Sequence, residues 1–201
     1  MLTRIAVLVS GGGTNLQALI DAQKKGVIKS GEISLVISSS PSAYALKRAE
    51  DNNIPHAVVS KKQLGSQQAF EDKIKQLLKD NNIDLIILAG FMSILSESFT
   101  KEYPERIINV HPSLIPSFCG KGFYGLKVHE AALEYGVKVT GATVHFVNEI
   151  PDGGKIILQK AVDIQEGDTP EILQKRVMEQ AEWILLPRAA EQVSKEIAER
   201  K

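Results

Sequence analysis

Short apolar runs alternate with amphipathic stretches through the first half of the chain, and this alternation limits the folds that the chain can adopt. The apolar runs are rich in β-branched residues and predict strands at 5–10, 33–38, 56–59, 85–89 and 107–110. The stretches between them have helical periodicity and predict helices at 16–24, 43–52, 67–79 and 96–103. This alternation favours a mostly parallel sheet with right-handed crossovers and helices on both faces.

The pattern changes in the second half of the chain. Two longer stretches rich in β-branched residues, 138–147 and 155–162, flank a segment that carries one proline and two glycines. This predicts a C-terminal antiparallel strand addition to the parallel sheet. Thr169 followed by Pro170 is typical of a helix start, and we expect that helix to run to about residue 199. Without a repeat or linker, residues 1–201 are expected to form one α/β domain.

Composition and charge fit a globular domain with no strong electrostatic preference. The mass of 22.0 kDa is enough to bury a full core. Lys plus Arg and Asp plus Glu each number 24, so no global field attracts nucleic acid or an anionic membrane. The single cysteine, Cys119, excludes an intrachain disulfide. The first apolar run is too short to span a bilayer and has no signal cleavage site after it, so we expect a cytoplasmic protein.

An amide and an imidazole stand at the end of the fifth predicted strand. Asn109 and His111 are two residues apart, so they should point to the same face of the sheet, and Pro112 cannot continue the strand. Ligands bind beyond the carboxyl ends of parallel strands, where Gly11 and Gly90 also fall. An amide donor beside an imidazolium suits the oxyanion of a tetrahedral acyl-transfer intermediate. A capped strand followed by a polar turn is the alternative interpretation.

The segment 10–15, Ser-Gly-Gly-Gly-Thr-Asn, connects the first predicted strand to a helix. Glycines let the backbone approach an anion closely, and free N–H groups at a helix N-terminus favour negative charge. The segment is not a dinucleotide fingerprint, because Leu16 takes the place of the third glycine, and it lacks the lysine of a P-loop. Spacing alone leaves a phosphate site and a plain tight turn as equal alternatives.

Several motifs together resemble the folate-dependent phosphoribosylglycinamide formyltransferases of purine synthesis. The motifs are the 10–15 segment, N-x-H-P-S-L-x-P at 109–116, T-G-A-T-V-H-F-V at 140–147 and D-G-G at 152–154. The resemblance runs from the first strand to the last helix. It implies formyl transfer from 10-formyltetrahydrofolate to the amine of glycinamide ribonucleotide, without a metal or a covalent enzyme intermediate. Cys119 is therefore not expected to act as a nucleophile.

The resemblance also assigns catalytic roles. It implies that Asn109 is a neutral hydrogen-bond donor, that His111 is the general acid and oxyanion partner, and that Asp152 is the third catalytic residue. A carboxylate close to His111 should favour the imidazolium and raise its pKa. From the residues alone, the start of an Asp-Gly turn is the preferred explanation of Asp152. His145 is expected to support the site as a hydrogen-bonded buried histidine.

Binding residues follow from the resemblance in the same way. Gly13, Thr14 and Asn15 are implied in phosphate binding, and Glu182 in ribose binding, with Glu179 as an alternative on the same helical face. The residues implied in folate binding, on loops that we expect at one edge of the sheet, are Met92, Ser93, Ile94, Leu95, Asn109, Asn148, Glu149, Ile150 and Pro151. Many relatives carry an arginine where this chain has Ser93, so backbone contacts are expected there.

Other functions and one insertion remain as alternatives. A formyltetrahydrofolate hydrolase would use water as the acceptor, but such enzymes carry an N-terminal regulatory domain and a second histidine in place of Pro112. A non-catalytic nucleotide-binding module would not need Asn109, His111 and Asp152 together. Neutral charge and the lack of a C-terminal RNA-binding domain disfavour a methionyl-tRNA formyltransferase. The segment 120–125 is longer than in many relatives, and it is either a mobile flap or a surface insertion.

Overall fold

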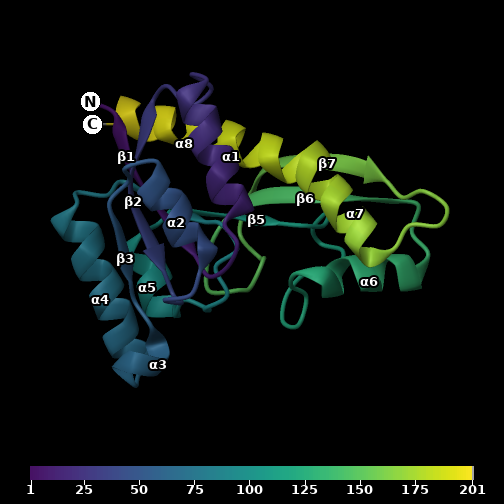
Figure 1. The fold of residues 1–201 in the computed structure, drawn as a ribbon, viewed down its shortest axis with the longest axis horizontal. Helices are drawn as coiled ribbons and strands as arrows, with labels where there is room; N and C mark the ends of the chain where they lie inside the picture. The colour runs from purple at the N-terminus through teal and green to yellow at the C-terminus, as the bar shows by residue number, and fades with distance from the viewer. Residues whose placement is uncertain (201) are drawn as a thin grey trace.

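A seven-stranded sheet in the order β3-β2-β1-β4-β5-β6-β7 forms the centre of the protein in a computed structural model that describes residues 1–200 (Figure 1). The strands are β1 (Thr3–Val9), β2 (Gly31–Ser38), β3 (His56–Val58), β4 (Leu85–Leu88), β5 (Ile107–His111), β6 (Val139–Phe146) and β7 (Ile156–Asp163). The first five strands are parallel, whereas β6 is antiparallel to both β5 and β7. The predicted α/β class and C-terminal antiparallel addition are confirmed.

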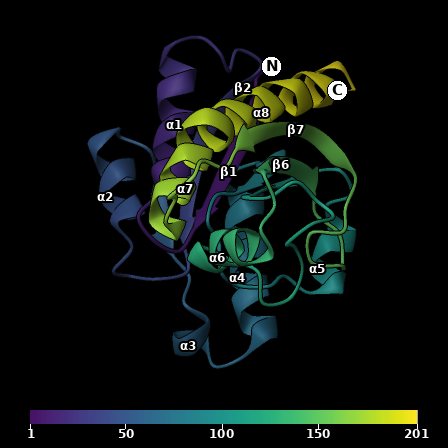
Figure 2. The ribbon, with the colours of Figure 1, turned by 90° about the vertical axis from the view of Figure 1, so that its right-hand side faces the viewer.

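Helices cover both faces of the sheet. They are α1 (Thr14–Lys24), α2 (Tyr44–Asp51), α3 (Lys61–Leu64), α4 (Gln67–Asp80), α5 (Glu97–Glu102), α6 (Leu126–Tyr135), α7 (Pro170–Val177), the π-helical turn η1 (Met178–Glu182) and α8 (Trp183–Glu199). Apolar residues of α1, α2, α7 and α8 pack on one face, and those of α4 and α5 pack on the other (Figures 1 and 2). No helix within residues 1–200 is both long and apolar enough to cross a membrane.

Strand β1 shows why its apolar run lacks polar alternation. Ile5 and Val7 are fully buried on the face that carries α1 and α8, and Leu8 is fully buried on the face that carries α4. Because successive side chains of a strand point to opposite faces, a central parallel strand must be apolar at every position. The same reasoning explains why the apolar runs of the sequence predicted the parallel strands well.

Helix α6 is the main element that the sequence pattern did not predict. Its buried strip consists of Val128, His129 and Ala132, which is too short and too polar to give a clear helical periodicity. Gly125 precedes the helix, and Gly136 ends it in the left-handed conformation with a φ of 79°. α6 lies beside α7 (Figures 1 and 2).

The long C-terminal helix contains a feature that the sequence analysis did not foresee. Between α7 and α8 the chain forms a π-helical turn at Met178–Glu182. A π turn contains one more residue than the α-helical turn that it replaces. This extra residue turns Glu182 into the protein interior, where its exposed fraction is 6 %.

The segment that connects β6 to β7 runs from the amino end of β5 back toward its carboxyl end. Phe146 pairs with Ile108 at the amino end of β5, so the chain leaves β6 at the edge opposite His111. Asp152 nevertheless lies beside His111, and the connection therefore folds back over the sheet. Because β6 is antiparallel to β5, the 148–151 loop starts at the end of the strands opposite the 92–95 loop and reaches the His111 end, where we expected both loops, only by folding back.

We expect Gly141→Ala to destabilise the β6–β7 pair that carries this connection. A Cβ atom at Gly141 would collide with the backbone carbonyl oxygen of Lys160 and approach the Leu114 side chain to 2.8 Å. The free energy of unfolding should fall by about 2 kcal/mol or more, as for overpacked cores. Urea unfolding followed by circular dichroism measures this. Gly12→Ala is the control, because its added methyl group would meet nothing within 4 Å.

Candidate active site

Strand β5 presents Asn109 and His111 on the face that carries α4 and α5, together with Ile107 of the same strand. His111 has an exposed fraction of 4 %, and Asn109 is half-buried. The antiparallel neighbour β6 places His145 directly opposite Asn109 and Thr143 directly opposite His111. The sheet therefore brings two histidines, an amide and a hydroxyl together at the carboxyl end of β5.

Asp152 joins this group from the β6–β7 connection. Its Oδ2 atom lies 3.5 Å from Nδ1 of His111, and its Oδ1 atom lies 3.6 Å from Nε2 of His145. The glycines after it are required by space: a Cβ at Gly153 would lie 2.6 Å from Ile150, and one at Gly154 would collide with the Phe146 carbonyl. Asp152 thus lies inside a tight turn, which the Gly153 N–H closes by donating to the Ile150 carbonyl at 2.9 Å, and its carboxylate also contacts the two histidines.

The segment 118–120 makes a hydrogen bond to both His111 and Asp152. Nε2 of His111 donates to the Phe118 carbonyl at 2.8 Å, and the Gly120 N–H donates to Oδ2 of Asp152 at 2.8 Å. The hydrogen bond to Phe118 leaves Nδ1 as the His111 nitrogen that faces Asp152. The glycine-rich segment 120–125 therefore begins in contact with Asp152, and its role as a flap or a surface insertion stays a prediction.

The pKa of His111 has the opposite net direction to the expectation. Burial lowers the pKa below its usual value, and this outweighs the Phe118 hydrogen bond and the negative charge of Asp152, which both raise it. The predicted effect of Asp152 is present, but the predicted net rise is wrong. Burial raises the pKa of Asp152, but the nearby His145 ring, the charge of His111 and the hydrogen bond from the Gly120 N–H hold it below its usual value. A neutral imidazole therefore faces an ionised carboxylate near neutral pH.

Asn109 is oriented by His145. Nδ1 of His145 donates to the Phe146 carbonyl at 2.8 Å, so its Nε2 can accept from Nδ2 of Asn109 at 3.2 Å. One N–H of the Asn109 amide is used in this contact, and the other remains for a ligand. His145 is almost fully buried and hydrogen-bonded, in the supporting position that we expected for it.

Thr143 and Gln159 bind the backbone of residues 113–115, which follow His111. The sequence analysis assigned neither of them a role. The Thr143 hydroxyl donates to the Ser113 carbonyl at 2.7 Å and accepts from the Ile115 N–H at 3.1 Å. The Gln159 amide donates to the same hydroxyl and to the Ile115 carbonyl, each at 3.0 Å. Only the placement of Thr143 opposite His111 in an antiparallel pair signals this role, and a single sequence does not reveal that register.

His129 of α6 is a third residue that sequence reasoning missed. It is fully buried, and neither of its ring nitrogens has a hydrogen-bond partner within residues 1–200. Burial, together with the positive charge that His111 can carry, lowers the pKa of His129 to about 4. His129 is therefore neutral near physiological pH and adds no charge close to His111.

Cys119 lies in the segment next to His111, and its thiol donates to the Pro116 carbonyl at 3.3 Å. Burial and the negative charge of Asp152 raise the pKa of this thiol. Since the thiolate is the reactive form, these surroundings disfavour nucleophilic chemistry at Cys119. Within residues 1–200, no group of three or more histidine, cysteine, aspartate or glutamate side chains is placed to hold a metal ion.

The 10–15 segment turns into α1 through Gly13, which has a φ of 72°. Within residues 1–200, the backbone N–H groups of Gly12, Gly13 and Thr14 donate to no protein acceptor. Asn15 donates from Nδ2 to Oε2 of Glu182 at 2.8 Å. Burial raises the pKa of Glu182, although the Asn15 hydrogen bond opposes this. Free donors and a buried carboxyl group thus meet at the N-terminus of α1.

The structure separates the two candidate glutamates for ribose binding. Glu182 contacts Asn15 in the interior, whereas Glu179 lies on the surface, 3.9 Å from Lys175. The π turn at Met178–Glu182 causes this difference, because it rotates Glu182 inward. Glu182 is therefore the one that the structure brings to the 10–15 segment.

Apolar side chains are exposed on the two loops that were predicted to bind folate. Met92 and Ile94 have exposed fractions of 58 % and 71 %, and Ile150 has one of 58 %. Leu95 is buried, Ser93 is half-buried, and Glu149 and Pro151 are exposed. Exposed aliphatic side chains on loops next to a polar site are typical of walls for an apolar ring. The Asn148 side chain accepts from the Ile150 N–H at 3.0 Å and shapes the second loop.

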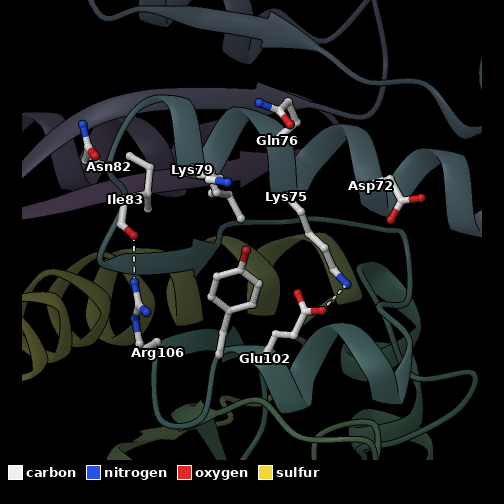
Figure 3. A pocket seen from close by; sticks show the side chains of 10 residues that line it. Asp72, Lys75, Gln76, Lys79, Asn82, Ile83, Glu102 and Arg106 are labelled. Atoms are coloured by element: carbon white, nitrogen blue, oxygen red, sulfur yellow. Dashed lines mark hydrogen bonds and ion pairs between the residues drawn. The ribbon is translucent and has the colours of Figure 1, made fainter.

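A surface cavity of about 530 Å³ lies elsewhere, between α4 and the start of β5 (Figure 3). Two of the cations that line it already have protein partners: Lys75 pairs with Glu102 at 2.9 Å, and Arg106 donates to the carbonyls of Ile83 and Asp84. It lies at the amino ends of β4 and β5, opposite the edge where His111 stands. We therefore place the active site at the His111 group.

Comparisons with known proteins identify the family of this chain. The model of the family described as Formyl transferase matches residues 3–189. The phosphoribosylglycinamide formyltransferase of Haemophilus influenzae is 43 % identical over 179 residues, which are 89 % of this chain and 82 % of that protein. This chain belongs to the phosphoribosylglycinamide formyltransferase family.

Solved structures support the family assignment. Glycinamide ribonucleotide transformylase 1 from Symbiobacterium toebii matches with a TM-score of 0.90 and 39 % identity, over 97 % of this chain and 89 % of that one. The phosphoribosylglycinamide formyltransferase of Coxiella burnetii, solved in complex with CHES, matches with a TM-score of 0.87 and 40 % identity. The match covers 100 % of this chain and 89 % of that one. The trifunctional purine biosynthetic protein of Gallus gallus is 46 % identical over 95 % of this chain, but the chain spans only 18 % of its length.

For this formyltransferase-family member we expect Asp152→Asn to lower the pKa of His111 further. The carboxylate favours the charged imidazole, so replacing it with a neutral amide removes a contribution that raises the pKa. NMR titration of the histidine ring protons in both proteins measures the change. His56 is the internal control, because it lies exposed on β3 away from the site. An equal or higher His111 pKa in the variant would show that Asp152 is only a turn residue.

Proposed function

We propose that this chain transfers the formyl group of 10-formyltetrahydrofolate to the amine of glycinamide ribonucleotide. The observation that carries the proposal is the meeting of Asn109, His111 and Asp152 at the end of β5, in a chain of the phosphoribosylglycinamide formyltransferase family. We further propose that residues 1–201 act as one formyltransferase domain. A cytoplasmic location, small-molecule partners without nucleic acid or membrane, and a reaction without metal stay predictions.

The reaction exchanges one carbon–nitrogen bond for another. The neutral amine of the ribonucleotide attacks the formyl carbon, a new C–N bond forms, and the carbonyl electrons move onto oxygen to give a tetrahedral oxyanion. Collapse of this intermediate breaks the bond from carbon to N10 of the folate. One proton leaves the amine and one reaches N10, so the reaction needs proton transfer but no oxidant or reductant.

His111 is placed to carry that proton. Its Nε2–H is committed to the Phe118 carbonyl, so in the neutral ring Nδ1 holds the lone pair and faces Asp152. Nδ1 accepts the proton of the attacking amine, and the imidazolium formed in this way stands between the oxyanion and Asp152. The imidazolium then gives the proton to N10. The lowered pKa of His111 favours the unprotonated form with which this cycle begins.

Asn109 and Asp152 stabilise the charges that develop. The remaining N–H of the Asn109 amide donates to the oxyanion, and its orientation is fixed beforehand by His145. Asp152 stabilises the imidazolium through its negative charge, while the Gly120 N–H keeps the carboxylate in place. These donors are held by the sheet and its loops, so little reorganisation is needed when the charge forms.

Substrate placement follows from the surrounding loops. The free N–H groups of Gly13, Thr14 and Asn15 bind the substrate phosphate, and Glu182 binds the ribose hydroxyls. The folate ring lies between the two loops with exposed aliphatic side chains, which supply Met92, Ser93, Ile94, Leu95, Asn148, Glu149, Ile150 and Pro151. The exposure of Met92, Ile94 and Ile150 supports this placement.

We expect His111→Ala to lower kcat by at least about 100-fold with a modest effect on KM, because the residue acts on the transition state. Formation of tetrahydrofolate is followed with and without glycinamide ribonucleotide. Cys119→Ala is the matched control from the adjoining segment, and its kcat should stay within about two-fold of the parent, as expected for a group outside the chemical step. Folate consumption that ignores the amine would identify a hydrolase and overturn the proposed function.

A folate analogue should protect the 92–95 and 148–151 loops from amide hydrogen exchange at the same time. Binding an apolar ring between them removes the exposed side chains of Met92 and Ile150 from water and orders both backbones. Exchange is measured by mass spectrometry with and without the analogue. Helix α3, at Lys61–Leu64, serves as the unprotected reference. Protection of one loop without the other would contradict the folate placement.

A further inference from the structure

Arg48 of α2 is the cationic side chain that contacts the glycine-rich 10–15 segment within residues 1–200. Its Nε donates to the Gly12 carbonyl at 2.8 Å, and its Nη1 donates to Oε1 of Gln17 at 3.1 Å. The guanidinium also lies over the Tyr44 ring, 5.1 Å from its centroid. None of these contacts involves Asn109, His111 or Asp152, so the chemistry proposed for that group does not explain them.

The hydrogen bond to Gly12 determines the direction of a neighbouring donor. A trans peptide is planar, so the carbonyl of Gly12 and the N–H of Gly13 point in opposite directions. With the carbonyl fixed on Arg48, the Gly13 N–H is turned to the other side, and it has no acceptor within residues 1–200. A cation on the carbonyl oxygen also polarises the peptide group and makes its N–H a stronger donor.

The packing of the same segment supports a fixed geometry. Gly13 has a φ of 72°, and a Cβ atom there would lie 2.7 Å from Cβ of Ala45 and 3.4 Å from Cδ of Arg48. The Ala45 N–H donates to the Gly11 carbonyl at 3.1 Å. Helix α2 therefore contacts the segment through its backbone, its Cβ atoms and the Arg48 guanidinium at once.

The guanidinium itself is held in place from the α1 side. Gln17 accepts from Arg48 through Oε1 and donates through Nε2 to Oδ1 of Asp21 at 2.9 Å, one turn further along α1. These contacts fix the long Arg48 side chain before any ligand binds. A donor that is oriented beforehand loses less entropy when it binds an anion.

We propose that Arg48 is a positioning residue for phosphate recognition, which turns and polarises the Gly12–Gly13 peptide so that the Gly13 N–H points at the substrate phosphate. The proposal rests on the placement of the phosphate given under Proposed function. Under this proposal, recognition of a phosphate monoester depends on the Arg48 side chain, although Arg48 does not contact the phosphate. Lysine keeps the charge at this position but lacks the planar fork that bonds Gly12 and Gln17 together.

The test compares Arg48→Met with the parent on glycinamide ribonucleotide and on its dephosphorylated nucleoside. KM for the ribonucleotide should rise about 10-fold while kcat stays within about two-fold, because a charge-assisted hydrogen bond is lost without touching the reacting atoms. The kcat/KM for the nucleoside should not change. The KM of Arg48→Lys for the ribonucleotide should lie between those of the parent and Arg48→Met. Equal losses on both substrates, or no loss on the ribonucleotide, would overturn the proposal.

Lys47→Met is the matched control, because it removes one positive charge from the adjacent position of α2. Lys47 is exposed and pairs only with Glu50 and Asp51 among the residues that the structure describes. Its KM for the ribonucleotide should equal that of the parent. An increase as large as that of Arg48→Met would mean that net charge, and not the Gly12 contact, controls phosphate binding, and this would also overturn the proposal.

A binding measurement keeps the inference separate from the proposed reaction. Ribose 5-phosphate is titrated into the parent, Arg48→Met and Lys47→Met, and Kd is measured by calorimetry, with circular dichroism to show that each protein is folded. Kd should rise at least about five-fold in Arg48→Met alone. Equal Kd values in all three would refute the role of Arg48. If the parent binds ribose 5-phosphate but does not formylate the ribonucleotide, the proposed function fails and the Kd comparison still decides the inference.

Discussion

The Asp152 carboxylate, shared between two histidines and one backbone amide, is the interaction on which the site depends. It joins three segments that are far apart in sequence: β5 through His111, β6 through His145 and the glycine-rich segment through the Gly120 N–H. An ionised carboxylate in a half-buried place is stable only when such partners surround it. The path of the β6–β7 connection, the Asp-Gly-Gly turn and the start of the glycine-rich segment all serve to bring these partners within reach.

The direction of the pKa shifts shows which physical effect is larger at each group. For His111, loss of hydration exceeds the attraction of Asp152, so the ring is neutral at rest. For Asp152, the hydrogen bonds and the neighbouring rings exceed the loss of hydration, so the carboxyl group is ionised. A neutral base next to a fixed negative charge is well suited to receive a proton for a short time, because the charged pair exists only while the intermediate does.

The parallel strands could be predicted from the sequence, because strands buried on both faces must be apolar at every position. Asn109 and His111 could be placed at one strand end by counting residues. The contact of Asp152 with His111 could not be derived in this way, because the β6–β7 connection starts at the opposite edge of the sheet. Helix α6 was missed because its buried strip includes a histidine, and the role of Thr143 depends on a strand register that a single sequence does not contain.

The hydrogen bond from the Met92 N–H to the Ser10 hydroxyl, at 2.9 Å, connects the two substrate loops. Ser10 begins the segment proposed for phosphate, and Met92 begins the loop proposed for folate. Ordering of either loop by its ligand restricts the other through this bond, so the entropy that the second ligand must lose is smaller. Such coupling is reciprocal, because each ligand changes the affinity for the other by the same factor. The bond therefore joins the places proposed for two chemically unrelated substrates within one small domain.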